Sequence, residues 1–363
     1  MSRAAAVDAF VERRTEANER FFTAEAERIA RLCQALAERF AVGGRLIAVG
    51  GSPQGWSDAH HVAVEFVHPV IVGKRALPAL AVAPDAVDAI VEADDTVISF
   101  EPLRFSLGEA EWRFEPPTDD PFVRQELCET LYHVVWELVH VFFEHLGSSS
   151  AGAGAAAFLY PFLGEQRGPL DHVVDDVRRS VLMKSDEIGR LRADTLGRCE
   201  PELAAAADGL RGAFAAGGTL FALGNGGSAT DAEDAVADFR CAPQGWPQRR
   251  AIDLSSDAAI LTALANDIGP EVVFQRQVIA YARPGDAVLA LSTSGDSANV
   301  VAALREARER GLVTIALVGY DGGRIASERL ADHVVVTHSE HIPRIQEAQA
   351  AAYHVLRELV EVR

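Results

Sequence analysis

Two loops rich in glycine and hydroxyl side chains could bind a phosphate group. Residues 224–228 read Gly-Asn-Gly-Gly-Ser and lie between a stretch that predicts a strand and one that predicts a helix. Residues 292–297 read Ser-Thr-Ser-Gly-Asp-Ser and follow another predicted strand in the same way. In a doubly wound sheet, such turns direct backbone amides and the start of a helix toward an anion. Either loop alone could be a tight turn or a helix cap, but two at one sheet edge favour phosphate binding.

A second group of side chains has the chemistry of metal ligands. His61 and Glu65 are four residues apart in a predicted helix, so both side chains lie on one face and could reach one ion. Gln125 and His133 are eight residues apart in an amphipathic segment, about 12 Å of rise if both are helical. That span is long for one metal ion. We expect either that Gln125 lies in the non-helical entrance to its helix or that the site draws on more than one chain or copy.

The chain contains an internal repeat that relates these two groups. Residues 44–66 align with residues 217–239 at an offset of 173, and both segments read as strand, turn and helix. A second match relates residues 125–134 to residues 346–355 at an offset of 221, so the first copy is 48 residues shorter between the two anchors. The missing residues correspond to about one or two βα units. The sequence therefore predicts two unequal tandem copies of one domain.

The repeat assigns different chemistry to each copy. Where the first copy has the His and Glu of its metal-type pair, the second has Asp234 and Asp238, and it retains Gln346 and His354. Two carboxylates can still bind a cation, but loss of the imidazole weakens a preference for zinc. The first copy has a proline in its glycine-rich turn, which removes an amide donor, and no counterpart of the serine-rich loop. One copy keeps the metal-type residues and the other keeps the phosphate loops.

Alternating elements in the second copy predict an α/β fold. We expect a helical stretch over residues 170–216, a helix from residue 229, and strands at residues 219–223, 250–254, 287–291, 313–318 and 333–336. This order is typical of a doubly wound, flavodoxin-like parallel sheet with flanking helices. In the first copy, residues 97–100 are the last expected strand, and the acidic, Pro-rich stretch after them is interpreted as irregular. We predict a truncated domain over residues 1–147, a linker over residues 148–169 and a complete domain over residues 170–363.

Composition argues against several classes of partner. The 363 residues include 34 Lys and Arg against 53 Asp and Glu, a net charge of −19, which disfavours nucleic acid and anionic membranes as ligands. The four cysteines form no CxxC pair, and the N-terminal segment lacks the apolar stretch of a signal peptide. The longest apolar run is too short and too polar to span a bilayer. We expect a soluble cytoplasmic protein that holds any phosphate through amides and hydroxyls.

The second copy resembles the SIS (sugar isomerase) domain of the phosphoheptose isomerases, which interconvert sedoheptulose 7-phosphate and a manno-heptose 7-phosphate. The resemblance covers roughly residues 170–363. It rests on GNGGSATDA, on Ala-Asn-Asp at residues 265–267, on STSGDSAN, on Asp-Gly-Gly at residues 321–323, and on RIQE followed by His354. It implies substrate contacts from Asn225, Gly226, Gly227, Ser228, Asn266, Asp267, Ser292, Thr293, Ser294, Ser297 and Gln346.

The same resemblance implies a zinc-dependent enzyme. The family's zinc ligands correspond to His61, Glu65, Gln125 and His133 in the first copy and, with two departures, to Asp234, Asp238, Gln346 and His354 in the second. We expect an aldose–ketose isomerase that works through an enediol. Glu65 is the expected base, and His133 is the acid or a zinc ligand that helps to polarise the carbonyl.

The resemblance also implies an assembly and leaves one alternative open. Members of this family are tetramers with active sites at subunit interfaces, so we expect a pseudo-dimer that dimerises again, with metal from the first copy and phosphate loops from the second. The alternative is a non-catalytic protein, because similar SIS domains occur in regulators that sense sugar phosphates and in the DnaA initiator-associating protein. The full set of metal-type residues in the first copy favours the enzyme.

Overall fold

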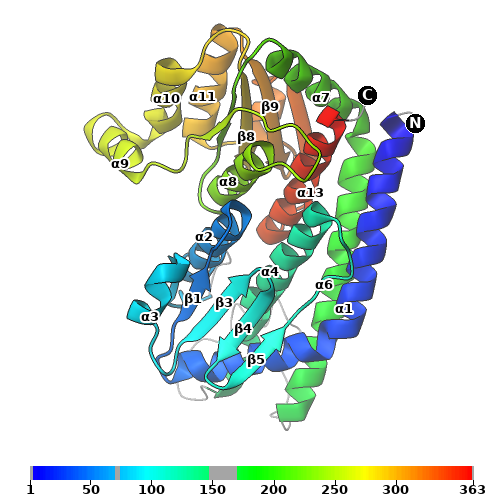
Figure 1. Ribbon diagram of the computed structural model, residues 1–363, viewed down its shortest axis with the longest axis vertical. Helices are drawn as coiled ribbons and strands as arrows, with labels where there is room; N and C mark the ends of the chain where they lie inside the picture. The colour runs from blue at the N-terminus through cyan, green and yellow to red at the C-terminus, as the bar shows by residue number, and fades with distance from the viewer. Residues whose placement is uncertain (1–2, 70–73, 147–169, 362–363) are drawn as a thin grey trace. The chain divides into compact units, whose positions relative to one another are not determined.

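The computed structural model describes residues 3–69, 74–146 and 170–361 (Figure 1). The predicted linker at residues 148–169 lies outside the described residues. The chain divides into two compact units. Unit 1 comprises Met1–Glu16, Asp120–Glu126 and Ile188–Arg363, and unit 2 comprises Ala17–Asp119 and Leu127–Glu187. The boundaries fall within three helices, α1 (Arg3–Ala41), α4 (Pro121–Leu146) and α6 (Leu170–Arg198), so each of these helices contributes residues to both units.

Unit 1 contains a five-stranded sheet in the order β10-β9-β8-β6-β7, and all its strand pairs are parallel. The strands are β6 (Leu220–Leu223), β7 (Ala251–Asp253), β8 (Ala287–Ser292), β9 (Val313–Gly319) and β10 (His333–Thr337). These are the five strands expected from the sequence. The doubly wound parallel sheet of the second copy is therefore confirmed.

Helices cover both faces of the unit 1 sheet. The start of α1, α7 (Glu200–Ala215), α8 (Gly227–Arg240) and α13 (Ile342–Glu361) share one apolar core with the sheet, and α10 (Val273–Tyr281), α11 (Ala298–Glu309) and α12 (Gly323–Ser327) share the other. In β6, Leu220 belongs to the first core and Phe221 to the second. Successive strand residues point to opposite faces, so a strand covered on both sides is largely apolar, as in the Leu-Phe-Ala-Leu of β6.

Unit 2 contains a mixed sheet in the order β2-β1-β3-β4-β5. The strands β1 (Leu46–Val49), β2 (Ala79–Val82) and β3 (Thr96–Phe100) are parallel, whereas β4 (Leu103–Leu107) and β5 (Ala110–Arg113) form an antiparallel hairpin beside β3. The interpretation of this stretch as irregular was wrong. The sequence pattern that indicates strand β4 is the alternation in Leu-Arg-Phe-Ser-Leu. Its apolar residues are buried and its polar residues are half-buried.

Helix α2 (Pro53–Val67) carries the metal-type pair of the first copy. It begins where the Ser52 hydroxyl accepts a hydrogen bond from the Gly55 amide at 2.9 Å, and Pro53 occupies the first turn, where a missing amide costs little. The Phe40 ring of α1 lies 6.0 Å from Phe66 of α2 and 6.3 Å from Phe143 of α4. Helix α3 (Val87–Ile90) of unit 2 is short.

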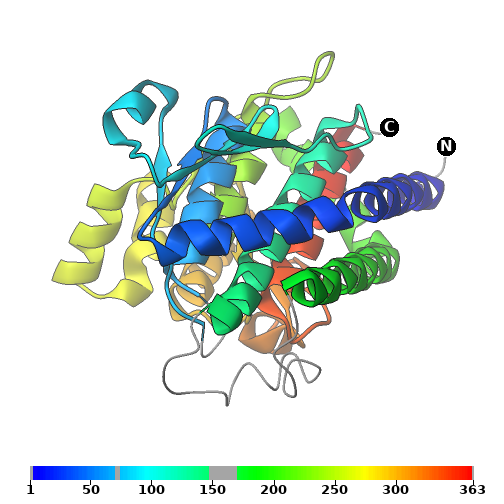
Figure 2. The same ribbon diagram turned by 90° about the horizontal axis from the view of Figure 1, so that it is seen from below.

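The segments of α1 and α6 within unit 2 lie side by side (Figures 1 and 2). The Asn18 side-chain amide of α1 donates to both the carbonyl and the hydroxyl of Ser185 in α6, each at 2.9 Å. Both groups are buried, so the bonds fix the register of two long helices. No helix within the described ranges is long and apolar enough to cross a membrane.

The two units repeat one plan. The order β2-β1-β3 in unit 2 matches β7-β6-β8 in unit 1, and α2 follows β1 as α8 follows β6. The hairpin β4–β5 stands where unit 1 continues with β9 and β10 and their connecting helices. The topology of the two sheets is consistent with two unequal copies, the first one shortened, and this stays a prediction.

Candidate functional site

His61, Glu65 and His133 form a buried cluster in unit 2, as the sequence predicts. The Nε2 atoms of His61 and His133 are 3.2 Å apart, and His61 Nε2 lies 3.9 Å from Glu65 Oε1. In a tetrahedral zinc site with bonds of about 2.0–2.1 Å, two nitrogen ligands are about 3.3 Å apart. One imidazole from α2, one from α4 and a carboxylate one turn along α2 therefore have the spacing of a metal centre.

The electrostatics of this cluster favour neutral imidazole. Burial, together with the neighbouring His133, lowers the pKa of His61 well below 6.5. Metal ions bind the deprotonated ring nitrogen, so a ring that is already neutral needs no proton removed before it can act as a ligand. These residues could hold a metal ion, and the donor set of two imidazoles and one carboxylate suits zinc.

Gln125 lies in the second turn of α4, so the explanation that it occupies a non-helical entrance is wrong. It belongs to unit 1, where its Nε2 donates to Asp234 Oδ1 at 2.7 Å. Gln346, its counterpart in the repeat, is buried in α13.

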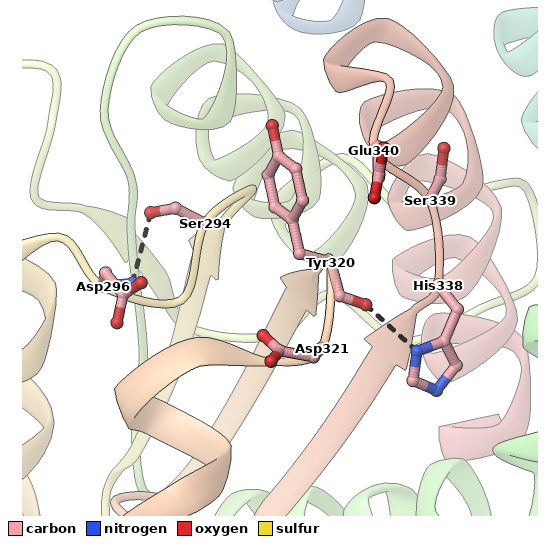
Figure 3. Close-up of a pocket in the computed structure, with 7 residues that line it drawn as sticks. All are labelled: Ser294, Asp296, Tyr320, Asp321, His338, Ser339 and Glu340. Atoms are coloured by element: carbon pink, nitrogen blue, oxygen red, sulfur yellow. Dashed lines mark hydrogen bonds between the residues drawn. The ribbon is translucent and has the colours of Figure 1, made fainter.

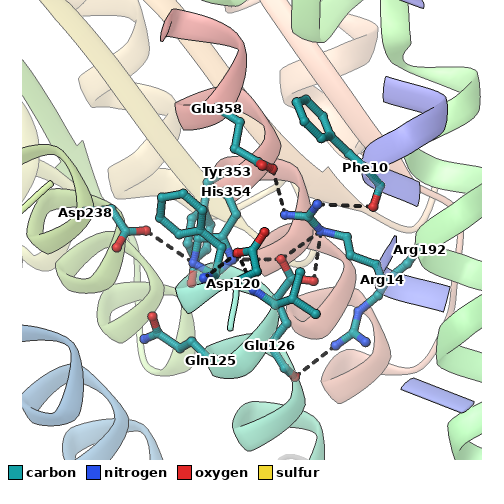
Figure 4. Close-up of polar contacts among 12 residues, drawn as sticks. Phe10, Arg14, Asp120, Gln125, Glu126, Arg192, Asp238, Tyr353, His354 and Glu358 are labelled. Atoms are coloured by element: carbon teal, nitrogen blue, oxygen red, sulfur yellow. Dashed lines mark hydrogen bonds and ion pairs between the residues drawn. The ribbon is translucent and has the colours of Figure 1, made fainter. Parts of the chain in front are cut away.

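Asp234 and Asp238 of α8 and His354 of α13 form the corresponding cluster in unit 1. Figure 4 shows Asp238 and Glu126 beside His354. His354 Nε2 lies 3.2 Å from Asp238 Oδ2 and 3.4 Å from Asp234 Oδ2, while its Nδ1 lies 3.0 Å from Glu126 Oε1. Burial alone favours the neutral ring, but hydrogen bonds with the three carboxylates raise the pKa of His354 well above 6.5. These carboxylates favour the protonated form of the ring.

His354 belongs to a wider set of buried ion pairs. The Arg14 Nε donates to Glu126 Oε1 at 2.9 Å, and Arg14 Nη2 donates to Glu358 Oε2 at 3.0 Å. Burial would raise the pKa of Glu126, but the charges of Arg14, His354 and Arg192 lower it to about 2. We refer to these residues as the His354 network: Arg14, Glu126, Asp234, Asp238, His354 and Glu358. Sequence reasoning did not find Arg14 or Glu126 because their partners lie far along the chain.

The two predicted phosphate loops lie at the carboxyl ends of β6 and β8, which are neighbours in the sheet. The Ser292 hydroxyl accepts from the Gly295 amide at 3.1 Å and lies 3.4 Å from the Ser297 hydroxyl. Asn225 of the first loop and Asn299 at the start of α11 exchange two amide hydrogen bonds of 2.8 and 3.0 Å. The loops are thus joined to each other, with Asn299 as a residue that the sequence analysis missed.

The other predicted substrate residues are distributed around these loops. Ser228 is buried in the first turn of α8, and Ser294 accepts from the Asp296 amide at 3.2 Å. Asn266 and Asp267 are exposed at the end of α9 (Ala258–Asp267), where the Asn266 amide donates to Asp267 at 2.8 Å.

A pocket of about 720 Å³ lies beside the second loop, at the carboxyl ends of β8, β9 and β10 (Figure 3). Its lining comprises Ser294, Asp296, Tyr320, Asp321, His338, Ser339 and Glu340. The Tyr320 carbonyl accepts from His338 Nδ1 at 3.0 Å. Only Ser294 was a predicted substrate residue. The three carboxylates of the lining repel a phosphate but can accept hydrogen bonds from sugar hydroxyls.

Gly295 is required by the geometry of the second loop. Its φ of +68° is in the left-handed region, and an added Cβ would lie 2.2 Å from the Gly322 carbonyl oxygen. We expect Gly295→Ala to destabilise the protein by roughly 1–3 kcal/mol and to weaken phosphate binding, measured by urea unfolding and calorimetry. Gly212→Ala is the control, because an added Cβ there meets open space among the described residues and favours helix α7. Equal stability of the two variants would contradict the expectation.

Comparison with known proteins agrees with this architecture. Residues 185–319 match the family described as SIS domain. The phosphoheptose isomerase of Pelobacter propionicus is 48% identical over 153 residues, which are 41% of this chain and 78% of that protein. That of Trichlorobacter lovleyi is 46% identical over 152 residues, 41% of this chain and 75% of the relative.

A solved structure resembles nearly the whole chain. The C-terminal domain of glucosamine-fructose-6-phosphate aminotransferase from Francisella tularensis has a TM-score of 0.57, covering 97% of this chain and 93% of that chain. The sequences are 11% identical, so this likeness concerns the fold alone.

The fold and the loops at its carboxyl edge define an SIS-domain protein of the sugar-phosphate isomerase class. The segment shared with the curated relatives spans three quarters or more of their length at over 40% identity. The chain belongs to the phosphoheptose isomerase family and is an isomerase, an intramolecular oxidoreductase.

Proposed function

We propose that this protein converts sedoheptulose 7-phosphate to D-glycero-D-manno-heptose 7-phosphate with the help of a zinc ion. The observation that carries the proposal is the buried cluster of His61, Glu65 and His133 in a chain of this family. His61 and Glu65 would hold the metal, and His133 is either a third ligand or the acid. The resemblance also implies Gln125, which belongs to unit 1. When bound, zinc supplies the Lewis acid that polarises the sugar carbonyl.

The residues of the cluster provide the proton transfers that an aldose–ketose isomerisation needs. Glu65 takes a proton from C1 of the ketose and returns it to C2. Where His133 is the acid instead of a ligand, it donates a proton to the oxygen on C2 as the enediol forms and takes back the proton of the oxygen on C1 as the aldehyde forms. No external oxidant or reductant is needed, because C1 is oxidised as C2 is reduced.

The phosphate of the substrate is assigned to the loops of unit 1. The hydrogen-bond donors are hydroxyls and amides of Ser228 and of residues 292–297. These donors carry no formal charge, so they can bind a phosphate without Lys or Arg in a chain of net charge −19. The sugar hydroxyls are assigned to the polar lining of the neighbouring pocket.

Ser297→Ala tests the phosphate assignment. Ser297 precedes α11 without a side-chain capping bond to that fully described helix, so loss of its hydroxyl should cost little stability. We expect KM to rise roughly tenfold or more with kcat little changed, because a hydrogen bond to a charged group contributes about 1.5–3 kcal/mol. Ser256→Ala, which removes a hydroxyl bonded to Asp253 near β7, is the control. Unchanged KM in Ser297→Ala would contradict the assignment.

We also propose that the chains associate as a dimer of pseudo-dimers in the cytoplasm. Helix α9, all of whose residues are described, has no fully buried residue, although Leu261 and Leu264 pack against the apolar core of unit 1. Ile268 just beyond it is 56% exposed. A second chain would cover this apolar surface. Light scattering of the wild type and of Ile268→Asp tests the assembly.

The decisive experiment combines metal analysis with an isomerase assay. Purified protein should contain zinc and should convert sedoheptulose 7-phosphate, chelation should abolish the conversion, and added zinc should restore it. Binding of the sugar phosphate without any metal-dependent turnover would instead support the non-catalytic alternative.

A further inference from the structure

One residue of the pocket beside the second loop has an unusual backbone conformation. Tyr320 directly follows the last residue of β9 and has a φ of +52°. A bulky side chain seldom adopts this left-handed conformation, and it does so only where the surrounding structure holds it. Residues held in this way cluster at ligand sites, so the backbone of Tyr320 directs attention to what its side chain does.

We propose that Tyr320 is a specificity-determining residue that contacts the hydroxyl-bearing carbon chain of the sugar phosphate, while residues 292–297 bind the phosphate. The inference rests on the proposed function, which assigns the phosphate to the loops and the sugar hydroxyls to this pocket. It adds the side chain that distinguishes a sugar phosphate from phosphate alone.

The turn that carries Tyr320 is fixed to the second loop. The Gly322 amide donates to the Gly319 carbonyl at 2.8 Å, which closes a β-turn with Tyr320 as its second residue. A positive φ at that place is normally that of glycine, asparagine or aspartate. The Gly319 amide in turn donates to the Thr293 carbonyl of the second loop at 3.1 Å. These bonds hold Tyr320 at a fixed position relative to the proposed phosphate site.

The side chain of Tyr320 lies within the lining of the pocket. Figure 3 shows its ring between Ser294 of the second loop and Glu340 of the segment after β10. The residue is half-buried, and its hydroxyl has no hydrogen-bond partner within the described ranges. A tyrosine offers an apolar ring face to the C–H groups of a sugar and a hydroxyl that both donates and accepts, with few rotatable bonds to fix.

The charges of the lining favour a neutral group over a phosphate. Asp296, Asp321 and Glu340 carry carboxylates, and the described residues of the lining include no Lys or Arg. A phosphate is an anion and would be repelled by these carboxylates, whereas sugar hydroxyls can donate hydrogen bonds to them. The pocket therefore fits the hydroxyl-bearing part of the substrate, which would lie against Tyr320.

Binding of two probes separates recognition of the sugar from binding of the phosphate. Calorimetry measures the affinities of sedoheptulose 7-phosphate and of inorganic phosphate for each variant. Tyr320→Phe should weaken binding of the sugar phosphate roughly two- to tenfold, the effect of one neutral hydrogen bond, and leave binding of inorganic phosphate unchanged. Tyr320→Gly also removes the ring, so it should weaken binding of the sugar phosphate further, again without a change for inorganic phosphate.

Arg329→Gly is the matched control for the backbone. Arg329 has the same φ of +52°, is exposed and lies outside the lining of the pocket. Glycine adopts this conformation without strain at either position, so both glycine variants should keep a urea unfolding midpoint close to that of the wild type. Arg329→Gly should bind both probes as the wild type does.

The outcomes separate this inference from the proposed function. Unchanged binding of the sugar phosphate in the Tyr320 variants, or equal weakening of both probes, would overturn the inference, because Tyr320 would then act on nothing or through the phosphate loop. A wild type that binds the sugar phosphate no more tightly than inorganic phosphate would also overturn it. Tight binding without turnover would contradict the proposed isomerase, while the two affinities still decide the role of Tyr320. If Tyr320→Gly does not fold, Tyr320→Phe decides.

Discussion

Glu65→Gln is expected to lower the isomerase turnover number by roughly 10²–10⁴-fold, the range that general acid–base catalysis contributes. The amide has nearly the shape of the carboxylate, so the packing of buried Glu65 is retained. It cannot accept the proton from C1, and it is a poorer metal ligand. Steady-state kinetics on sedoheptulose 7-phosphate, together with the zinc content of the variant, measure both effects.

His60→Gln is the matched control for this variant. His60 is next to His61 on α2, but its ring packs edge-on against Trp56 with centroids 4.5 Å apart, and it is not a member of the cluster. We expect turnover within roughly twofold of the wild type, as for most substitutions outside a site. Full activity in Glu65→Gln would remove Glu65 from the mechanism.

Glu126→Gln is expected to destabilise unit 1 by about 3–5 kcal/mol, the cost of removing one partner of a buried ion pair. Arg14 and His354 both lose the anion that they share, and each is buried. Urea unfolding followed by tryptophan fluorescence measures the change. Glu27→Gln is the control, because its pair with Arg31 is exposed, with side chains 61% and 51% accessible, and such pairs contribute about 0–1 kcal/mol. Equal stability of the two variants would contradict the role of the network.

The same comparison has a defined pH dependence. The pKa of Glu126 is lowered to about 2, so its stabilisation is complete above the unfolded value of 4.5 and is lost as the pH falls from there toward 2. The pKa of His354 is raised, so its contribution is complete below 6.5 and is lost as the pH rises through its elevated pKa. We expect the difference in free energy of unfolding between wild type and Glu126→Gln to be largest near pH 5–6 and to become smaller in acid.

Much of the fold could be predicted because its signals are local. The strands β6, β8 and β9 are short apolar runs buried on both faces, and each is bounded by turn or helix signals. The repeat was visible because both copies kept the same strand, turn and helix around Asp58 and Asp231. The hairpin of unit 2 was missed because β5 is mostly exposed and carries little apolar pattern.

The candidate site was predictable only in part. Residue spacing on one helix determined that His61 and Glu65 share a face, and the repeat paired them with His133. The sequence could not show that Gln125 forms a hydrogen bond with Asp234, 109 positions away, or that Asn225 pairs with Asn299. Partners so far apart in the sequence meet only through packing, and no local pattern records them.

The amino-acid sequence by itself determined the class of fold, the tandem repeat and the residue types at each copy's ligand positions, because these depend on local periodicity and composition. Tertiary structure decided which groups surround the histidines. His133 and His354 occupy equivalent places in the repeat, yet His354 meets carboxylates from α4 and α8 whereas His133 meets the imidazole of α2. The carboxylates around His354 raise its pKa, and those groups are brought together only by the folded chain.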